Sequence, residues 1–156
     1  MKVLMVIPPK VENKWIVRED KYNGEMRSAC TPYHPVLLYT LLQRELPFAD
    51  FQLLEAQRDN LSTKQAIDRI HEINPDMIIT YISWSHIDYD RKMAELSYPT
   101  IGIIVQQTID RKEAIDLYKL KVKYICKNEI EEPIVKAIKE FYKKKKITET
   151  KGFFVV

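Results

Sequence analysis

The fold is constrained most by a series of short, continuous apolar runs, each closed by a chain breaker or a polar segment. The first run, residues 2–7, is followed directly by Pro8 and Pro9. Six residues are too few for a helix, and an unbroken apolar run is typical of a parallel strand that is covered on both faces. Proline has no N–H to donate, so the chain must leave the sheet at this point. Four further runs of this kind occupy residues 51–56, 77–82, 100–105 and 123–126.

Helical patterns stand between the runs. Leucines at helical spacing predict a helix over 34–46, and Ser62 with Gln65 has the spacing of a capping box that opens the next helix. Asn74 before Pro75 predicts the end of that helix. Further helices are expected over 86–96, from Asp110 to residue 117, and over 130–146.

This alternation predicts an α/β domain with a doubly wound, five-stranded parallel sheet and helices on both faces. The Rossmann-like or flavodoxin-like strand order 2-1-3-4-5 is the expected topology. We assign residues 1–147 to this domain. Residues 148–156 look like one more strand, which we interpret as a linker strand toward a missing partner domain.

Composition excludes several classes of function. The chain has 156 residues, a net charge of +3 and three glycines, so it is expected to form one domain without a glycine-rich phosphate loop. The charge is too small to indicate nucleic-acid binding, and Lys143 to Lys146 read as a solvated helix end. No run is long enough to predict a membrane span or a signal peptide, so cytoplasmic localisation is the expectation.

In this fold class, ligands bind at the carboxyl ends of the strands. The segments that follow the predicted strands are rich in hydroxyl and amide groups and contain one indole, which suits a large polar ligand with a flat face. Residues 57–60 belong to this rim. The candidate binding residues are Pro8, Pro9, Lys10, Ser83, Trp84, Ser85, His86, Gln106, Gln107, Thr108, Lys127, Asn128 and Glu129.

The sequence gives less support for a catalytic site than for a binding site. Ser83 or Ser85 with His86 and Asp88 could form a hydrolase site, but residues adjacent in sequence seldom face one another as nucleophile and base, and no G-x-S-x-G motif is present. We therefore predict no catalytic residue.

Two further groups of residues are weak candidates for a metal site and a phosphate site. Cys30 and His34 lack the second pair of ligands that a zinc site needs. Arg18, Lys21 and Arg27, in the polar insert over 10–33, could meet a phosphate, although exposed loop charges usually do nothing specific.

With these motifs in order, the chain resembles the N-terminal cobalamin-binding domain of radical-SAM enzymes. The opening VLMVIPP is similar to that family's first strand followed by prolines, and HPVLLYTLLQREL is similar to its proline-led first helix. The segment FQLLEAQRDNLSTKQAIDRIHEINPDMIITYISW resembles its D-A…S-x-x-E…P-D-x-V pattern, and YICKNEIEEPIVKAIKE its D-Y-V-x-x-G-E pattern. The last residues, ITETKGFFVV, resemble the strand that runs into the radical-SAM barrel.

The resemblance implies a corrinoid held at the carboxyl ends of the strands without a histidine ligand to cobalt. It also implies a partner barrel, in cis or in trans, that would carry the iron–sulfur cluster and S-adenosylmethionine. The two cysteines of this chain cannot supply the Cys-x-x-x-Cys-x-x-Cys cluster site, so the chain is not expected to be an enzyme on its own.

Three residues depart from the family pattern. Gln106 and Gln107 stand where glycines are usual, and Asn128 replaces another glycine. Glycine permits close backbone approach to a ligand. The alternative hypothesis is therefore a degenerate module that binds no cofactor and docks to a partner, or to another copy of itself, through residues 152–156.

Overall fold

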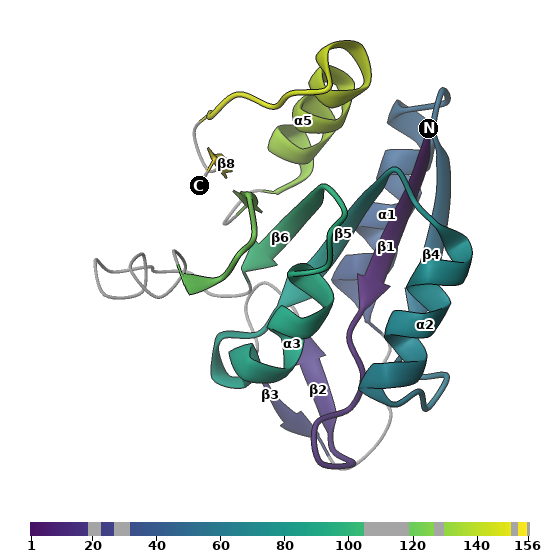
Figure 1. The fold of residues 1–156 in the computed structure, drawn as a ribbon, viewed down its shortest axis with the longest axis vertical. Coiled ribbons are helices and arrows are strands. Elements are labelled where there is room, and N and C mark those ends of the chain that lie inside the picture. Colours follow the sequence, from purple (N-terminus) through teal and green to yellow (C-terminus); the bar gives the residue numbers. More distant parts are fainter. Residues whose placement is uncertain (19–22, 27–31, 105–118, 127–129, 151–152, 156) are drawn as a thin grey trace.

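The computed structural model describes residues 1–18, 23–26, 32–104, 119–126, 130–150 and 153–155. Its main sheet has the order β4-β1-β5-β6-β7-β8 (Figure 1). The first five of these strands are parallel, and β8 is antiparallel to β7. The predicted order 2-1-3-4-5 is therefore confirmed for the parallel strands. The strands are β1 (Lys2–Ile7), β4 (Asp50–Glu55), β5 (Met77–Ile82), β6 (Thr100–Ile104), β7 (Tyr124–Cys126) and β8 (Phe153–Val155).

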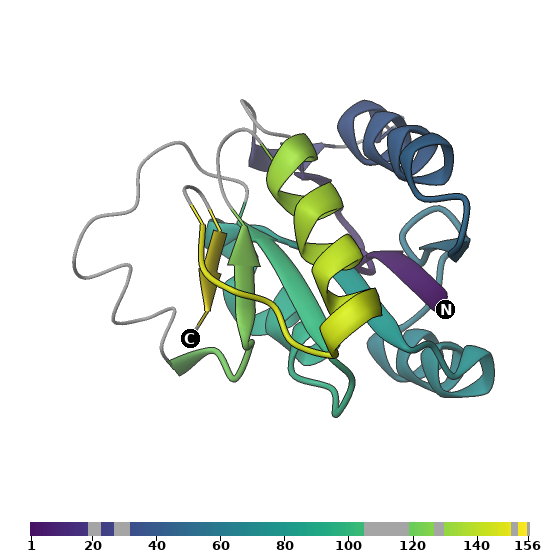
Figure 2. The same ribbon diagram turned by 90° about the horizontal axis from the view of Figure 1, so that it is seen from above.

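Helices cover both faces of the sheet, as Figure 2 shows. Helices α1 (Tyr33–Glu45) and α5 (Glu131–Lys144) lie on one face, and α2 (Thr63–Ile73) and α3 (Ile87–Ala94) lie on the other. Alternate side chains of β1 separate accordingly. Val3 and Met5 belong to the core under α1 and α5, whereas Leu4 and Val6 belong to the core under α2 and α3. A buried strand with two apolar faces is what the unbroken run at 2–7 predicted.

Local signals set the ends of the helices. The capping box at the start of α2 is present, because Ser62 Oγ accepts from the Gln65 N–H at 3.3 Å and Gln65 Oε1 accepts from the Ser62 N–H at 2.9 Å. The helix ends at Asn74, whose φ of 48° lies in the left-handed region. A short 3-10 helix, η1 (Trp84–His86), precedes α3. The helix predicted from Asp110 to residue 117 lies outside the described residues.

The insert over 10–33 contains a β-hairpin that the sequence pattern did not predict. Strands β2 (Trp15–Arg18) and β3 (Asn23–Met26) pair antiparallel, with Trp15 opposite Met26. A tight turn precedes β2, in which Val11 and Lys14 bridge and Asn13 has a φ of 65°. The hairpin stands at the carboxyl edge of the main sheet (Figure 1). The polar insert therefore lies where the ligand rim was predicted.

The end of the chain packs on its own sheet. β8 pairs with β7 along Tyr124 to Cys126, and the Phe153 side chain is fully buried, with its ring 6.2 Å from the ring of Tyr124. The docking hypothesis assigned Phe153 to a partner, whereas the structure places it in the core of this domain. Among the described residues, no helix is long and apolar enough to cross a membrane.

Candidate functional site

The crevice at the carboxyl edge is occupied by an arginine from the hairpin. β1 has β4 on one side and β5 on the other, so the segments that follow these strands diverge at this point. The Arg18 guanidinium donates to Asp90 through Nε (2.9 Å) and Nη2 (2.7 Å), and Nη2 also donates to the Pro9 carbonyl at 3.1 Å. The side chains of Arg18 and Asp90 are 1% and 0% exposed. The expectation that Arg18 is an exposed loop charge is wrong, because the ion pair with Asp90 allows its burial.

Gln57 joins the hairpin to the segment after β4. Its Oε1 accepts from the Ile16 N–H at 2.8 Å and from Arg18 Nη1 at 3.2 Å, and its Nε2 donates to the Ile16 carbonyl at 3.3 Å. A single buried amide therefore satisfies the N–H and the C=O of one hairpin residue. It replaces the backbone partner that a neighbouring strand would provide.

Charged side chains hold the outer surface of the hairpin. Lys14 pairs with Glu25 at 2.9 Å, which raises the pKa of Lys14 and lowers the pKa of Glu25 through the same hydrogen bond. The Tyr89 hydroxyl donates to Glu12 at 3.0 Å, and this hydrogen bond raises the pKa of Tyr89. Lys10 donates to Asn60 at 2.9 Å. These contacts are exposed and add less than the buried ones.

A serine and a histidine do meet after β5. Ser83 Oγ lies 3.1 Å from His86 Nδ1, and His86 Nε2 lies 3.6 Å from Glu25 Oε1. The expectation that these neighbours would not face each other is corrected, because the turn of η1 brings residue 86 back over residue 83. Asp88, the acid first considered, is 86% exposed and lies 4.0 Å from Arg91 instead.

The burial of Ser83 argues against nucleophilic attack by its hydroxyl group. Ser83 is fully buried, so its Oγ is closed to a substrate carbonyl, and its N–H donates to Asp90 at 2.8 Å. Ser83 therefore orients His86 and joins the segment after β5 to the carboxylate that holds Arg18.

The structure gathers part of the predicted rim. Pro8 and Pro9 are buried, Lys10 is half-buried, and Trp84 and Ser85 lie in η1 next to His86. Glu25 and Asp90 were missed, and both meet partners that are distant in sequence. The short apolar run Trp15-Ile16-Val17 was a signal for β2. Gln106, Gln107, Thr108, Lys127, Asn128 and Glu129 lie outside the described residues.

No cluster of metal-ligating side chains is found within the described part of the chain. Cys126, the cysteine that the structure describes, is buried at the end of β7. Comparisons of this chain with models of protein families, with curated proteins and with solved structures found no match.

A flat macrocycle does not fit between the hairpin and the sheet, because the Arg18 side chain and its buried partners fill that space. Of the predicted rim, η1 is the described segment that lies beside the hairpin.

Proposed function

We propose that this chain is a corrinoid-binding module that holds the cofactor at the carboxyl edge of its sheet, beside the hairpin. The observation that carries the proposal is the 2-1-3-4-5 strand order, with polar side chains at the carboxyl ends of the strands. Ligands bind at that edge in this fold class. The motifs that resemble the radical-SAM cobalamin domain support the choice of ligand.

The proposal divides the candidate residues into two groups. Ser83 and Asp90 keep the segment after β5 in position, because both are buried and bonded to each other. Direct contacts to the corrinoid come from Trp84, Ser85 and His86. The remaining contacts come from the segments after β6 and β7, namely Gln106, Gln107, Thr108, Lys127, Asn128 and Glu129.

In the radical-SAM family that the chain resembles, a bound corrinoid would supply methyl-transfer or radical chemistry, and a partner barrel would provide the iron–sulfur cluster and S-adenosylmethionine. In this proposal, the residues of this chain bind the corrinoid and hold it in a fixed orientation. They also exclude water from the crevice, because Arg18 and Gln57 close it between β1, β4 and the hairpin.

Titration of the purified chain with hydroxocobalamin, followed by visible absorption, tests the proposal. Saturable binding with a Kd of about 1 μM, roughly −8 kcal/mol, is the expected result. The combined Trp84→Ala, Gln106→Ala and Gln107→Ala variant should bind at least about tenfold more weakly. Gln43→Ala, a change of an exposed glutamine on α1, is the matched control and should leave binding unchanged. Absence of a spectral change at high concentration would refute the proposal.

A docking module without cofactor is the second candidate, and the filled crevice at Arg18 favours it. Truncation of residues 148–156 is a poor test, because it would remove the buried Phe153 from the core. A better test compares the sedimentation of the full chain with that of a Phe154→Lys variant, which measures self-association without shortening the chain. Self-association of the parent that is lost in the variant, with no cobalamin binding by either protein, would establish the docking function.

A further inference from the structure

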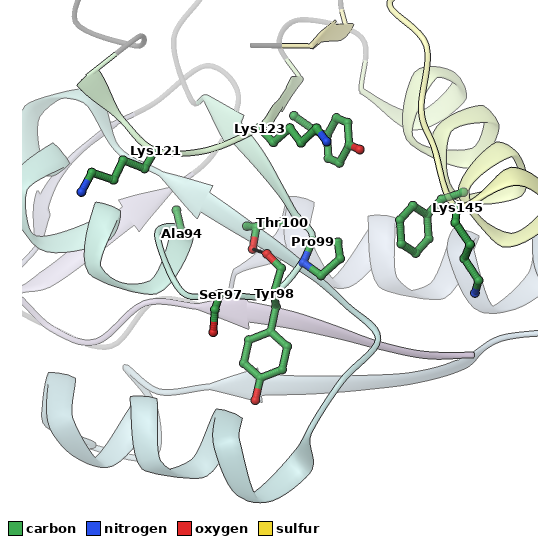
Figure 3. A pocket seen from close by; sticks show the side chains of 10 residues that line it. Ala94, Ser97, Tyr98, Pro99, Thr100, Lys121, Lys123 and Lys145 are labelled. Atoms are coloured by element: carbon green, nitrogen blue, oxygen red, sulfur yellow. Dashed lines mark hydrogen bonds between the residues drawn. The ribbon is translucent and has the colours of Figure 1, made fainter.

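Charged side chains converge at the carboxyl edge of the sheet rather than at the amino edge. A hollow of about 290 Å³ lies at the amino edge, between the loop 97–100 and the end of α5. Figure 3 shows that the side chains of Lys121 and Lys145 extend away from this hollow and from each other. At the carboxyl edge, in contrast, Glu25 of the hairpin and His86 of η1 face each other.

The two strands of the hairpin are fixed to the domain in different ways. β2 is anchored by the buried side chains of Arg18 and Gln57. A guanidinium and an amide keep the same charge between pH 5 and pH 8, so this anchor does not respond to pH in that range. β3 contacts η1, and its Glu25 side chain is 47% exposed there. The hold on β3 is therefore the weaker of the two.

The Glu25 carboxylate lies between two basic side chains. Lys14, in the turn that precedes β2, has its Nζ 2.9 Å from Glu25 Oε2, and His86 Nε2 lies 3.6 Å from Glu25 Oε1. The hydrogen bond from Lys14 is the main cause that lowers the pKa of Glu25, and His86 lowers it further. Glu25 therefore stays ionised at mildly acidic pH. Lys14 ties Glu25 to its own hairpin, whereas His86 ties it to the main domain.

His86 is held in the orientation that this contact requires. Its Nδ1 lies 3.1 Å from Ser83 Oγ, and its side chain is 11% exposed. A hydroxyl group both donates and accepts, so Ser83 can satisfy Nδ1 when the imidazole is neutral and when it is protonated. Nε2 therefore faces Glu25 in both protonation states.

The other charged or titratable groups around this contact have partners or face solvent. Glu12, in the turn before β2, accepts from the Tyr89 hydroxyl of α3 at 3.0 Å, and this hydrogen bond raises the pKa of Tyr89. On α3, Asp90 is paired with Arg18, and Asp88 is 86% exposed. Among the described groups that face the hairpin, the histidine is thus the one whose type changes charge between pH 5 and pH 8.

We propose that β3 is a proton-controlled latch over η1. With His86 protonated, its imidazolium pairs with Glu25 and holds β3 against η1. With His86 neutral, Glu25 is left to Lys14, and β3 opens from η1 more often. A two-stranded hairpin is only marginally stable by itself, so the loss of one tether changes how often its strand opens. The latch is tightest below the titration range of histidine and loosens as pH rises through it.

The latch controls access to η1, the described segment of the predicted rim that lies beside the hairpin. It is a property of the protein without ligand, so it does not rest on corrinoid binding. Hydrogen exchange of the full chain, followed by NMR at about pH 5 and about pH 8, tests it. After correction for the intrinsic exchange rate, the β3 amides should exchange about two- to fivefold faster at the higher pH, as expected from one exposed ion pair. The amides of β1 report global unfolding and serve as the internal reference.

Variants of the two partners locate the effect. Glu25→Gln keeps a side chain that accepts from Lys14 but carries no charge, and His86→Gln keeps a polar side chain that does not titrate. Each change should remove the pH difference at β3. Glu12→Gln is the matched control, because it removes the same charge from the same insert but acts at Tyr89. The pH difference should remain in this variant.

A second control concerns the other histidines. His71→Gln, on α2 and beside Tyr98, should leave the pH difference intact. Circular dichroism confirms that each variant folds. The proposal is overturned if the corrected β3 rates are equal at both pH values, if the pH difference survives in the Glu25 or the His86 variant, or if either control removes it. Since no cobalamin is added, such a result leaves the corrinoid proposal to its own titration.

Discussion

The charged side chains at the two edges of the sheet differ in burial and in pairing. At the carboxyl edge, Arg18 and Asp90 are 1% and 0% exposed and fully bonded to each other and to neighbouring groups. At the amino edge, Lys121 and Lys145 are exposed, and within the described residues they have no ion-pair partner. A buried charge without a partner is costly, whereas an exposed one costs little. The first edge is therefore built for stability and the second keeps its charges accessible.

The largest expected effect comes from breaking the buried pair. Asp90→Ala leaves the Arg18 guanidinium buried without its carboxylate and removes the acceptor of the Ser83 N–H, so it should cost about 3–5 kcal/mol. Urea denaturation measures the loss. Asp88→Ala, on the same helix but exposed, should cost less than about 1 kcal/mol.

A double variant refines this prediction. Arg18→Met with Asp90→Leu removes both charges and should recover much of the lost stability, because no unpaired charge remains buried. Equal losses for the Asp90 and Asp88 variants would show that the pair does not hold the hairpin.

The next effect concerns the amide that joins hairpin and sheet. Gln57→Ala removes the acceptor for the Ile16 N–H and for Arg18 and the donor to the Ile16 carbonyl, with an expected cost of about 1–3 kcal/mol. Hydrogen exchange at the Ile16 amide should accelerate more than exchange within β1. Gln52→Ala, whose side chain donates a hydrogen bond to Asp50 at 3.3 Å and not to the hairpin, is the control and should change neither rate.

A gain in stability is expected at the amino edge. Lys145→Gly relieves the left-handed residue after α5 and should stabilise the protein by about 1 kcal/mol, seen as a higher Tm. Lys144→Gly, inside the helix, should instead cost about 1 kcal/mol. A lower Tm for the Lys145 variant would mean that the lysine side chain supports the fold.

The smallest effect concerns the pH dependence of stability at a buried carboxyl group. Burial raises the pKa of Glu55, which has a side chain that is 6% exposed, above the ordinary value of 4.5. The folded state then holds its proton to higher pH than the unfolded state, so stability falls as pH rises from about 4.5 through the folded pKa. Glu55→Gln should remove this fall, and its advantage over the parent should grow from pH 4 to pH 7 in denaturation series.

A carboxylate with the opposite shift is the comparison. The hydrogen bond to Lys136 lowers the pKa of the exposed Glu132, so its contribution is present above 4.5 and is lost as pH falls through the folded pKa. Glu132→Gln should therefore lose stability relative to the parent at neutral pH. A fall in stability at pH 7 for the Glu55 variant would contradict the assignment.

Strands and helices with strong local signals were predictable to the residue. The runs at 2–7 and 77–82 match β1 and β5, and the capping box at Ser62 opens α2 as expected. The hairpin was not predicted, because its strands are only four residues long and β3 is mostly polar, and because the side chains that hold it, Gln57 and Asp90, lie elsewhere in the chain. For the candidate rim, the sequence predicted which segments follow the strands, but not which of their side chains contact one another.

The sequence by itself determined the α/β class, since apolar periodicity and caps act between neighbours along the chain, and the strand order then followed from the usual winding of that class. Only the tertiary structure decided which polar groups are buried. Arg18 meets Asp90 across 72 residues, and Gln57 meets Ile16 across 41. The physical reason is that a buried charge or amide is tolerated only where a partner is already in place, and that partner is selected by the packing of the whole domain.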